Sequence, residues 1–169
     1  MMSIRELIGV LALSAGLTNA SIAADGRPDV ARIISKDIAA EILGEPVRDP
    51  SPRSGEGADG YYSKCNYYSA HHGKSLVIRL QLPGPNAIAP DQELQLMSAA
   101  NGATEIVSGI GDAAQMSTAG GDSGFASRVL MLYVAKGGAF LTIGVSGFAN
   151  DAVALEKAKT VAQKLLEHL

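Results

Sequence analysis

Alternating hydrophobic and polar residues predict a β-hairpin in the first half of the chain. Within residues 75–82, leucine or isoleucine occupies nearly every second position, and polar residues such as Arg79 stand between them. This period of two is typical of a strand with one buried face. We expect the strand to pair with residues 61–70 across a turn at residues 71–74.

The same alternation returns near the C-terminal end and predicts a second hairpin. Residues 128–134 place Leu130 and Leu132 on one face of a strand. A turn at residues 136–138 follows, where two glycines suit a tight connection. Residues 139–145 then alternate again and form the expected return strand.

Hydrophobic residues at helical spacing predict three helices. Residues 29–43 carry valine or isoleucine at every fourth position, although Ser35 is also able to cap a shorter helix that begins at Lys36. A second helix is expected over residues 91–100. A third follows an N-cap at Asn150 and runs to the chain end.

These elements give the order α-ββ-α-ββ-α, which predicts an α+β fold. The simplest architecture is a four-stranded antiparallel sheet with the helices packed on one face. The repeated helix-then-hairpin plan also suggests an internal duplication. Residues 45–60 and 115–125 are rich in glycine, serine and other loop-forming residues and are expected to be surface loops. Residues 104–111 are expected to form a short strand or a turn.

A sheet with helices on one face leaves its other face to be explained. Alternation along the first strand puts Tyr67 on one face and Tyr62 with Tyr68 on the other, so one of these sets faces away from the core. Tyrosine is common in interfaces because its ring is amphipathic and loses little entropy on binding. We therefore predict partner contacts at Tyr62, Tyr68, Met131 and Tyr133, on an outer face that either binds a partner or is covered by the long loops.

The N-terminal residues predict export. Residues 7–17 are an apolar run, and small residues follow it. Ser21-x-Ala23 fits the small-x-small pattern of signal peptidase, so cleavage is expected after Ala23 or Ala24. The run of about eleven residues is too short for a membrane span, which needs roughly twenty. The mature chain, residues 24–169, is then expected to be one globular domain in the periplasm or outside the cell.

Charge and cysteine content narrow the possible functions. The chain has 14 Lys and Arg residues against 17 Asp and Glu residues, a formal net charge of −3. This acidic balance argues against a nucleic-acid partner, which requires a basic face. Cys65 is the only cysteine. It is a buried side chain, a reactive thiol or one half of an intermolecular disulfide.

Three short motifs lie along the predicted mature chain. They are Leu43-Gly44-Glu45-Pro46-Val47, Cys65-Asn66-Tyr67 and Gly109-Ile110-Gly111-Asp112-Ala113-Ala114. Together they resemble a broad group of small exported bacterial proteins and lipoproteins of unknown function. The resemblance implies the same order of elements and brings no activity. Members of that group often carry a second cysteine before the first helix, so the resemblance implies that Cys65 has lost its disulfide partner and is buried.

Three other patterns match only part of a known site. Gly121-Asp122-Ser123-Gly124 spells the nucleophile segment of chymotrypsin-like proteases, but no histidine stands in a matching context and the chain is too short for two β-barrels. Gly109-x-Gly111-x-x-Ala114 is similar to a dinucleotide-binding turn, but no convincing helix follows it. His71 and His72 supply at most two ligands to a metal that needs three or four.

We therefore expect an exported, non-catalytic domain that binds a protein or a cell-envelope component through the open face of its sheet. No catalytic residue, cofactor or metal is predicted, and no membrane span is expected in the mature form. The alternative function is a small-ligand carrier or hydrolase with a pocket between the sheet and the loops.

Overall fold

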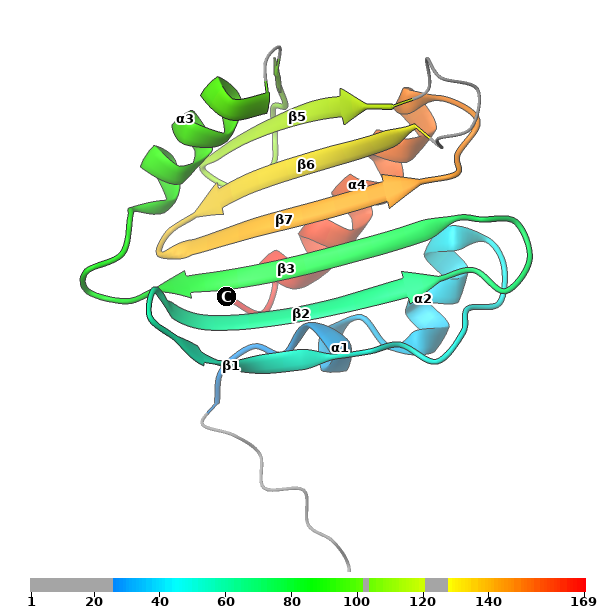
Figure 1. Cartoon of the computed structure of the whole chain (residues 1–169), viewed down its shortest axis with the longest axis horizontal. Coiled ribbons are helices and arrows are strands. Elements are labelled where there is room, and N and C mark those ends of the chain that lie inside the picture. Colours follow the sequence, from blue (N-terminus) through cyan, green and yellow to red (C-terminus); the bar gives the residue numbers. More distant parts are fainter. Residues whose placement is uncertain (1–25, 102–103, 121–127) are drawn as a thin grey trace, which may run out of the picture.

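The computed structural model describes residues 26–101, 104–120 and 128–169, and its strands form one antiparallel sheet (Figure 1). The sheet has seven strands in the order β1-β2-β3-β7-β6-β5-β4. The elements are α1 (Val30–Ile33), α2 (Lys36–Leu43), β1 (Arg53–Gly57), β2 (Gly60–Tyr68), β3 (Ser75–Pro83), α3 (Pro90–Asn101), β4 (Glu105–Ile106), β5 (Ala113–Ala119), β6 (Val129–Lys136), β7 (Ala139–Ser146) and α4 (Asp151–Leu166).

Both predicted hairpins are confirmed, but the prediction of a four-stranded sheet is wrong. The hairpins are β2–β3 and β6–β7, and they meet at the centre of the sheet through β3 and β7. Of the three additional strands, β4 lies in the segment 104–111, where a short strand or a turn is expected. The other two, β1 and β5, arise in segments whose composition predicts loops. β1 is an edge strand that is largely exposed on both faces, so it needs no hydrophobic period. β5 is built mostly from small side chains, which hide its alternation.

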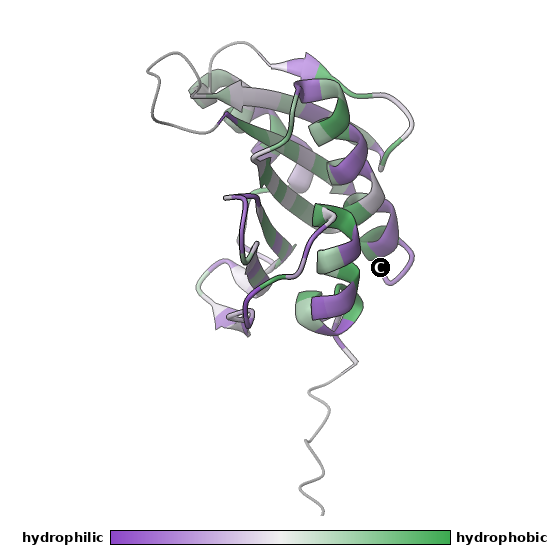
Figure 2. Cartoon of the chain, turned by 90° about the vertical axis from the view of Figure 1, so that its right-hand side faces the viewer, coloured by the Kyte–Doolittle hydropathy of each residue, from purple (hydrophilic) through white to green (hydrophobic). Residues whose placement is uncertain are grey.

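The expectation that all helices pack on one face is also wrong. Helices α1, α2 and α4 cover one face and enclose the main core, which contains Leu80, Leu132, Ile143 and Leu165. In Figure 1 these three helices lie behind the strands, and the side view of Figure 2 shows the helical layer on the side of the C-terminus. Helix α3 instead packs on the opposite face, where Leu94 joins a second, smaller cluster.

The break between α1 and α2 follows from a local competition that the sequence contains. Ser35 leaves helical geometry and its Oγ accepts a hydrogen bond from the N–H of Ile38, so the shorter helix beginning at Lys36 is confirmed. Gly44 ends this helix in the left-handed conformation, with a φ of 73°. The carbonyl that Ile34 exposes at the break accepts a hydrogen bond from the buried hydroxyl of Tyr67.

The described residues do not form two helix-then-hairpin units of the same arrangement, which the predicted duplication requires. Each half of the sheet is a meander of at least three strands, and the helices that precede the two meanders lie on opposite faces. Cys65 is free and buried in the main core, which confirms burial as its state. Within the described ranges, no helix is both long and apolar enough to cross a bilayer.

Candidate functional site

The sheet face opposite the main core has a covered half and an open half. Over β5, β6 and β7, helix α3 packs Leu94 and Met97 against Tyr133 and Phe140. Over β1, β2 and β3, none of the described helices packs on this face, and Figure 1 shows these three strands uncovered toward the viewer. We refer to this surface of β1–β3 as the open half.

The four predicted contact residues all lie on this face, but they divide between its halves. Tyr62 and Tyr68 belong to the open half, and the side chain of Tyr68 is 50% exposed. Tyr133 is buried beneath α3, with its ring stacked 6.5 Å from that of Phe140. Met131 is half-buried and lies over Gly144. A Cβ added to Gly144 would come within 2.8 Å of the sulfur of Met131. Met131 therefore stands at the border of the two halves.

Three cations form a row across the open half. Arg53 of β1 is the register partner of Lys64 in β2, and Lys64 is in turn the partner of Arg79 in β3. All three side chains are exposed. Directly opposite residues of an antiparallel pair have Cβ atoms about 4.5–5.5 Å apart, so the row brings three positive charges together.

A fourth cation extends this charge toward the far end of β2. Val47 forms a bridge with Ser69, and the N–H of Arg48 donates to the carbonyl of Tyr68 at 2.9 Å. Val47 is buried in the main core while Arg48 is exposed, so alternation places Arg48 on the open half beside Tyr68.

Negative charge is missing from the strands of this face. In the part of the chain that the structure describes, its strand positions carry no Asp or Glu, and none of the four cations has an ion-pair partner. Two carboxylates lie at its margin, Glu93 in the first turn of α3 and Asp59 in the β1–β2 turn. Burial of Glu93 raises the pKa of its carboxyl. The nearby Arg79 lowers this pKa and Asp59 raises it, so the net change is an increase.

Two tyrosines flank the row of cations along β2. The ring of Tyr62 lies over β1, where Gly55 and Gly57 leave room: a Cβ on either glycine would come within 4.0 Å of that side chain. At the other end, the amide of Asn66 donates to the hydroxyl of Tyr68 at 3.5 Å. The open half therefore presents aromatic groups at both ends and cations between them.

A small hollow opens beside Tyr62. Its volume is about 170 Å³, and its wall combines the β1–β2 turn with polar side chains of the open half. Gly60 holds the turn close, because a Cβ there would collide with the backbone at Leu82 and Gly84. The lining residues are Gly57, Ala58, Asp59, Gly60, Tyr62, Arg79 and Gln81.

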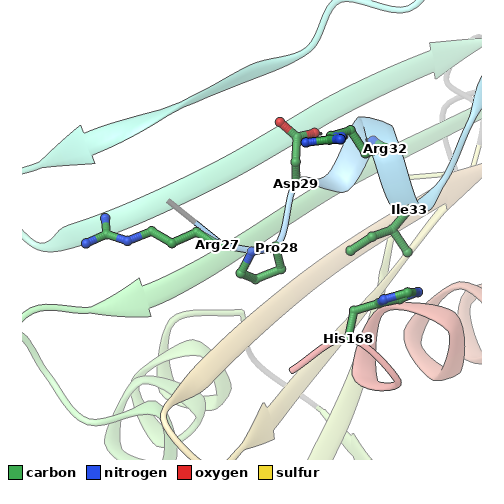
Figure 3. A pocket seen from close by; sticks show the side chains of 7 residues that line it. Arg27, Pro28, Asp29, Arg32, Ile33 and His168 are labelled. Carbon is green, nitrogen blue, oxygen red and sulfur yellow. Dashed lines mark hydrogen bonds between the residues drawn. The ribbon is translucent and has the colours of Figure 1, made fainter. Parts of the chain in front are cut away.

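A larger hollow of about 420 Å³ lies on the opposite side of the sheet, between α1 and the end of α4 (Figure 3). Two polar side chains in its wall, Asp29 and Arg27, already form bonds with other parts of the fold. Asp29 caps α1 by accepting from the N–H groups of Ala31 and Arg32. Arg27 pairs with Glu56, and Figure 3 shows its side chain pointing away from His168. This arrangement provides no convergent set of catalytic groups among the described side chains.

His72 and the glycine motif make contacts within the fold. His72 contacts Glu45 at 2.7 Å, and within the described ranges no cluster of His, Cys, Asp and Glu is suited to a metal. The turn at Gly111 leads into the strand β5 and not into a helix, in agreement with the sequence-based argument against a dinucleotide-binding turn. Asp112 instead accepts from the N–H of Gly137 at 2.6 Å and ties this turn to the β6–β7 hairpin. The protease-like segment 121–124 lies outside the described residues.

Sequence reasoning found the tyrosines but missed the cations. Alternation in the predicted hairpin was sufficient to place Lys64 and Arg79 on the same face as Tyr62. The position of Arg53 depends on β1, for which the sequence gives no periodic signal. Comparison with protein-family models and with curated proteins finds no match for the chain.

Proposed function

We propose that this protein is an exported, non-catalytic binding domain that holds a cell-envelope component against the open half of its sheet. The observation that carries the proposal is the joint exposure of tyrosines and unpaired cations on strands that no described helix covers. Export follows from the signal-like N-terminal residues, and the contact surface follows from the geometry of β1–β3.

The packing of the open half supports a binding role. Tyr68 and Val77 are exposed side chains on neighbouring strands, although the sheet buries comparable residues elsewhere. A partner that covered these two side chains would gain hydrophobic free energy. The strands themselves are anchored by the main core on their other face, so this surface is rigid before it binds.

The geometry gives less support to a small-ligand carrier or hydrolase. The hollow beside Tyr62 measures about 170 Å³, which is below the 300–1,000 Å³ that is usual for small-ligand pockets. The hollow of about 420 Å³ between α1 and α4 is large enough, but Asp29 and Arg27 in its wall already bond within the fold.

A hydrolase also requires a nucleophile next to a base. Among the described residues, His72 forms its hydrogen bond with Glu45 and not with a nucleophile. The thiol of Cys65 is buried in the core.

Binding to the envelope of the source bacterium tests this proposal. Purified mature protein is mixed with isolated envelope fragments, and the sedimented fraction is measured for wild type and for Tyr68→Ala. We expect Tyr68→Ala to weaken retention about tenfold, the effect of losing one interface anchor worth about 1.4 kcal/mol. Retention equal to wild type would contradict the proposal.

A matched variant on the helical face controls for general effects of removing an exposed apolar side chain. Val153 of α4 is 42% exposed and lies on the opposite side of the molecule from the open half. Val153→Ala should leave retention unchanged. Equal losses in Val153→Ala and Tyr68→Ala would show that the open half has no special part in binding.

A further inference from the structure

We infer that the partner of the open half is an anionic polysaccharide that lies along β2. This inference rests on the proposed function, and it adds the chemistry of the partner. It is carried by the register of Arg53, Lys64 and Arg79, by the position of the two tyrosines and by the polar hollow beside Tyr62.

The row of cations indicates a partner with negative charge. Like charges directly opposite each other destabilise an antiparallel pair, and Lys64 has a cation opposite it on both sides. Glu93 attracts Arg79 from the margin of the open half, but none of the described carboxylates forms an ion pair with these three cations, so most of their repulsion is not offset. An anionic group placed over Lys64 would meet three cations and relieve their repulsion.

The length of the site indicates a linear partner rather than a single anion. The outward residues of β2 are Tyr62, Lys64, Asn66 and Tyr68 in that order. At about 3.3–3.4 Å per residue, the tyrosines at the two ends are separated by about 20 Å along the strand. Arg48 adds a positive charge beside Tyr68 at one end. A free phosphate or acetate ion would occupy only the central part of this line.

The neighbours of the cations favour sugar as the backbone of this polymer. Tyrosine rings pack well against the apolar faces of sugar rings and also offer a hydroxyl group. The amide of Asn66 and the hollow lined by Asp59 and Gln81 suit hydroxyl groups. Asp59 and Arg79 carry opposite charges and both line this hollow, so it suits an uncharged polar sugar better than a phosphate group.

The net charge of the whole chain argues against nucleic acid as this partner. Duplex DNA carries one negative charge per about 1.7 Å of its axis and is bound by proteins with a broadly basic surface. This chain has a net charge of −3, and four of the described cations without an ion pair lie on this one surface. A polysaccharide with an acidic group on its sugar rings has a lower charge density, which four local cations are sufficient to hold.

Titration with a hyaluronan oligosaccharide, in which uncharged sugars alternate with carboxylated ones, tests the inference directly. Calorimetry of the mature protein should show binding to this probe and no binding to its methyl-esterified, uncharged form. The double variant Arg53→Gln/Lys64→Gln should weaken binding about tenfold or more at low salt, and its Kd should depend less on salt concentration than that of wild type. The variant Arg32→Gln/Lys157→Gln makes the same change of charge on the helical side and should bind like wild type.

Other outcomes would overturn the inference. Equal binding of the charged and esterified probes would show that charge is not recognised. Tighter binding to oligothymidylate or to mixed phosphatidylglycerol and phosphatidylcholine vesicles would identify a nucleic acid or a membrane surface instead. Loss of envelope retention in Tyr68→Ala without any loss in Arg53→Gln/Lys64→Gln would leave the proposed function standing and refute the polysaccharide. Equal retention of Tyr68→Ala and wild type would refute the proposed function itself.

Discussion

Lys64 lies directly opposite Arg79 across the β2–β3 pair, and both side chains project from the open half of the sheet. Arg53 approaches Lys64 from the other side in the same register. These three charges would attract an anionic partner. Without the partner they repel one another, and this repulsion lowers the stability of the fold.

Replacing Lys64 by glutamate should separate these two effects. Lys64→Glu converts repulsion into attraction with Arg53 and Arg79, which should raise the free energy of unfolding by about 0.2–1 kcal/mol. The melting temperature should rise by about 1–4 °C at low salt, and the gain should shrink at high salt. Binding to envelope fragments should fall in the same variant. A lower melting temperature together with unchanged binding would contradict both roles of Lys64.

The packing of α3 over β5–β7 should depend on a single leucine. Leu94 is 4% exposed and contacts the Tyr133 cluster, whereas Leu96 of the same helix is 52% exposed. Leu94→Ala should lower the free energy of unfolding by about 2–3 kcal/mol because it leaves a cavity beneath the helix. Leu96→Ala is the matched control and should change it by less than about 0.5 kcal/mol. Equal effects in urea denaturation would contradict the assignment of α3 to this face.

The α1–α2 break should be fixed by the hydroxyl of Tyr67. This buried group donates to the carbonyl of Ile34, so Tyr67→Phe leaves a buried acceptor without its partner. The expected loss is about 1–3 kcal/mol in the free energy of unfolding. Tyr61 donates to the carbonyl of Pro28 at 3.2 Å at a half-buried site, where water is able to replace it. Tyr61→Phe should therefore cost less, and a reversed order would argue against the contact of Tyr67.

The Asp112 contact predicts how stability depends on pH. The N–H of Gly137 and then the ammonium of Lys136 hold the pKa of the Asp112 carboxyl below its usual value near 3.8. A carboxyl with a lowered pKa in the folded state adds stability above its unfolded pKa and loses it as pH falls through the folded pKa. Asp112→Asn should therefore melt below wild type at pH 7.

Acidification should remove this difference. Below the folded pKa of Asp112 both proteins carry a neutral side chain, so their melting temperatures should converge as the pH falls below 3.8 and through that folded pKa. Glu41→Gln removes a carboxylate from the exposed surface of α2 and serves as the control for the change of net charge. A constant gap between Asp112→Asn and wild type across this range would contradict the role of the charge.

The sequence predicts the parts of this fold in which burial alternates. In β3 the buried residues Leu76, Ile78 and Leu80 stand at every second position, so the order of residues alone is sufficient to locate the strand and its hairpin. The cap at Ser35 and the stop at Gly44 are equally local signals. In each case a few neighbouring residues determine the geometry.

The remaining elements depend on contacts that a local pattern does not contain. The strand β1 has no buried side chain and exists because its backbone pairs with β2. In the described part of helix α3, Leu94 is the buried residue. A single buried position does not indicate the face of the sheet on which the helix packs. For the same reason the sequence predicts Tyr62 and Tyr68 at the site but not Arg53, and it does not reveal that Tyr133 is covered.

Site-specific photo-crosslinking in living cells shows whether the open half touches the envelope. A benzophenone amino acid is placed at position 68 of the open half, and in a second strain at position 153 of α4, where the side chain is also exposed. We expect an adduct with an envelope component from position 68 and none from position 153. Adducts from position 153 alone, or none at position 68 while the protein remains bound to the envelope, would contradict binding through the open half.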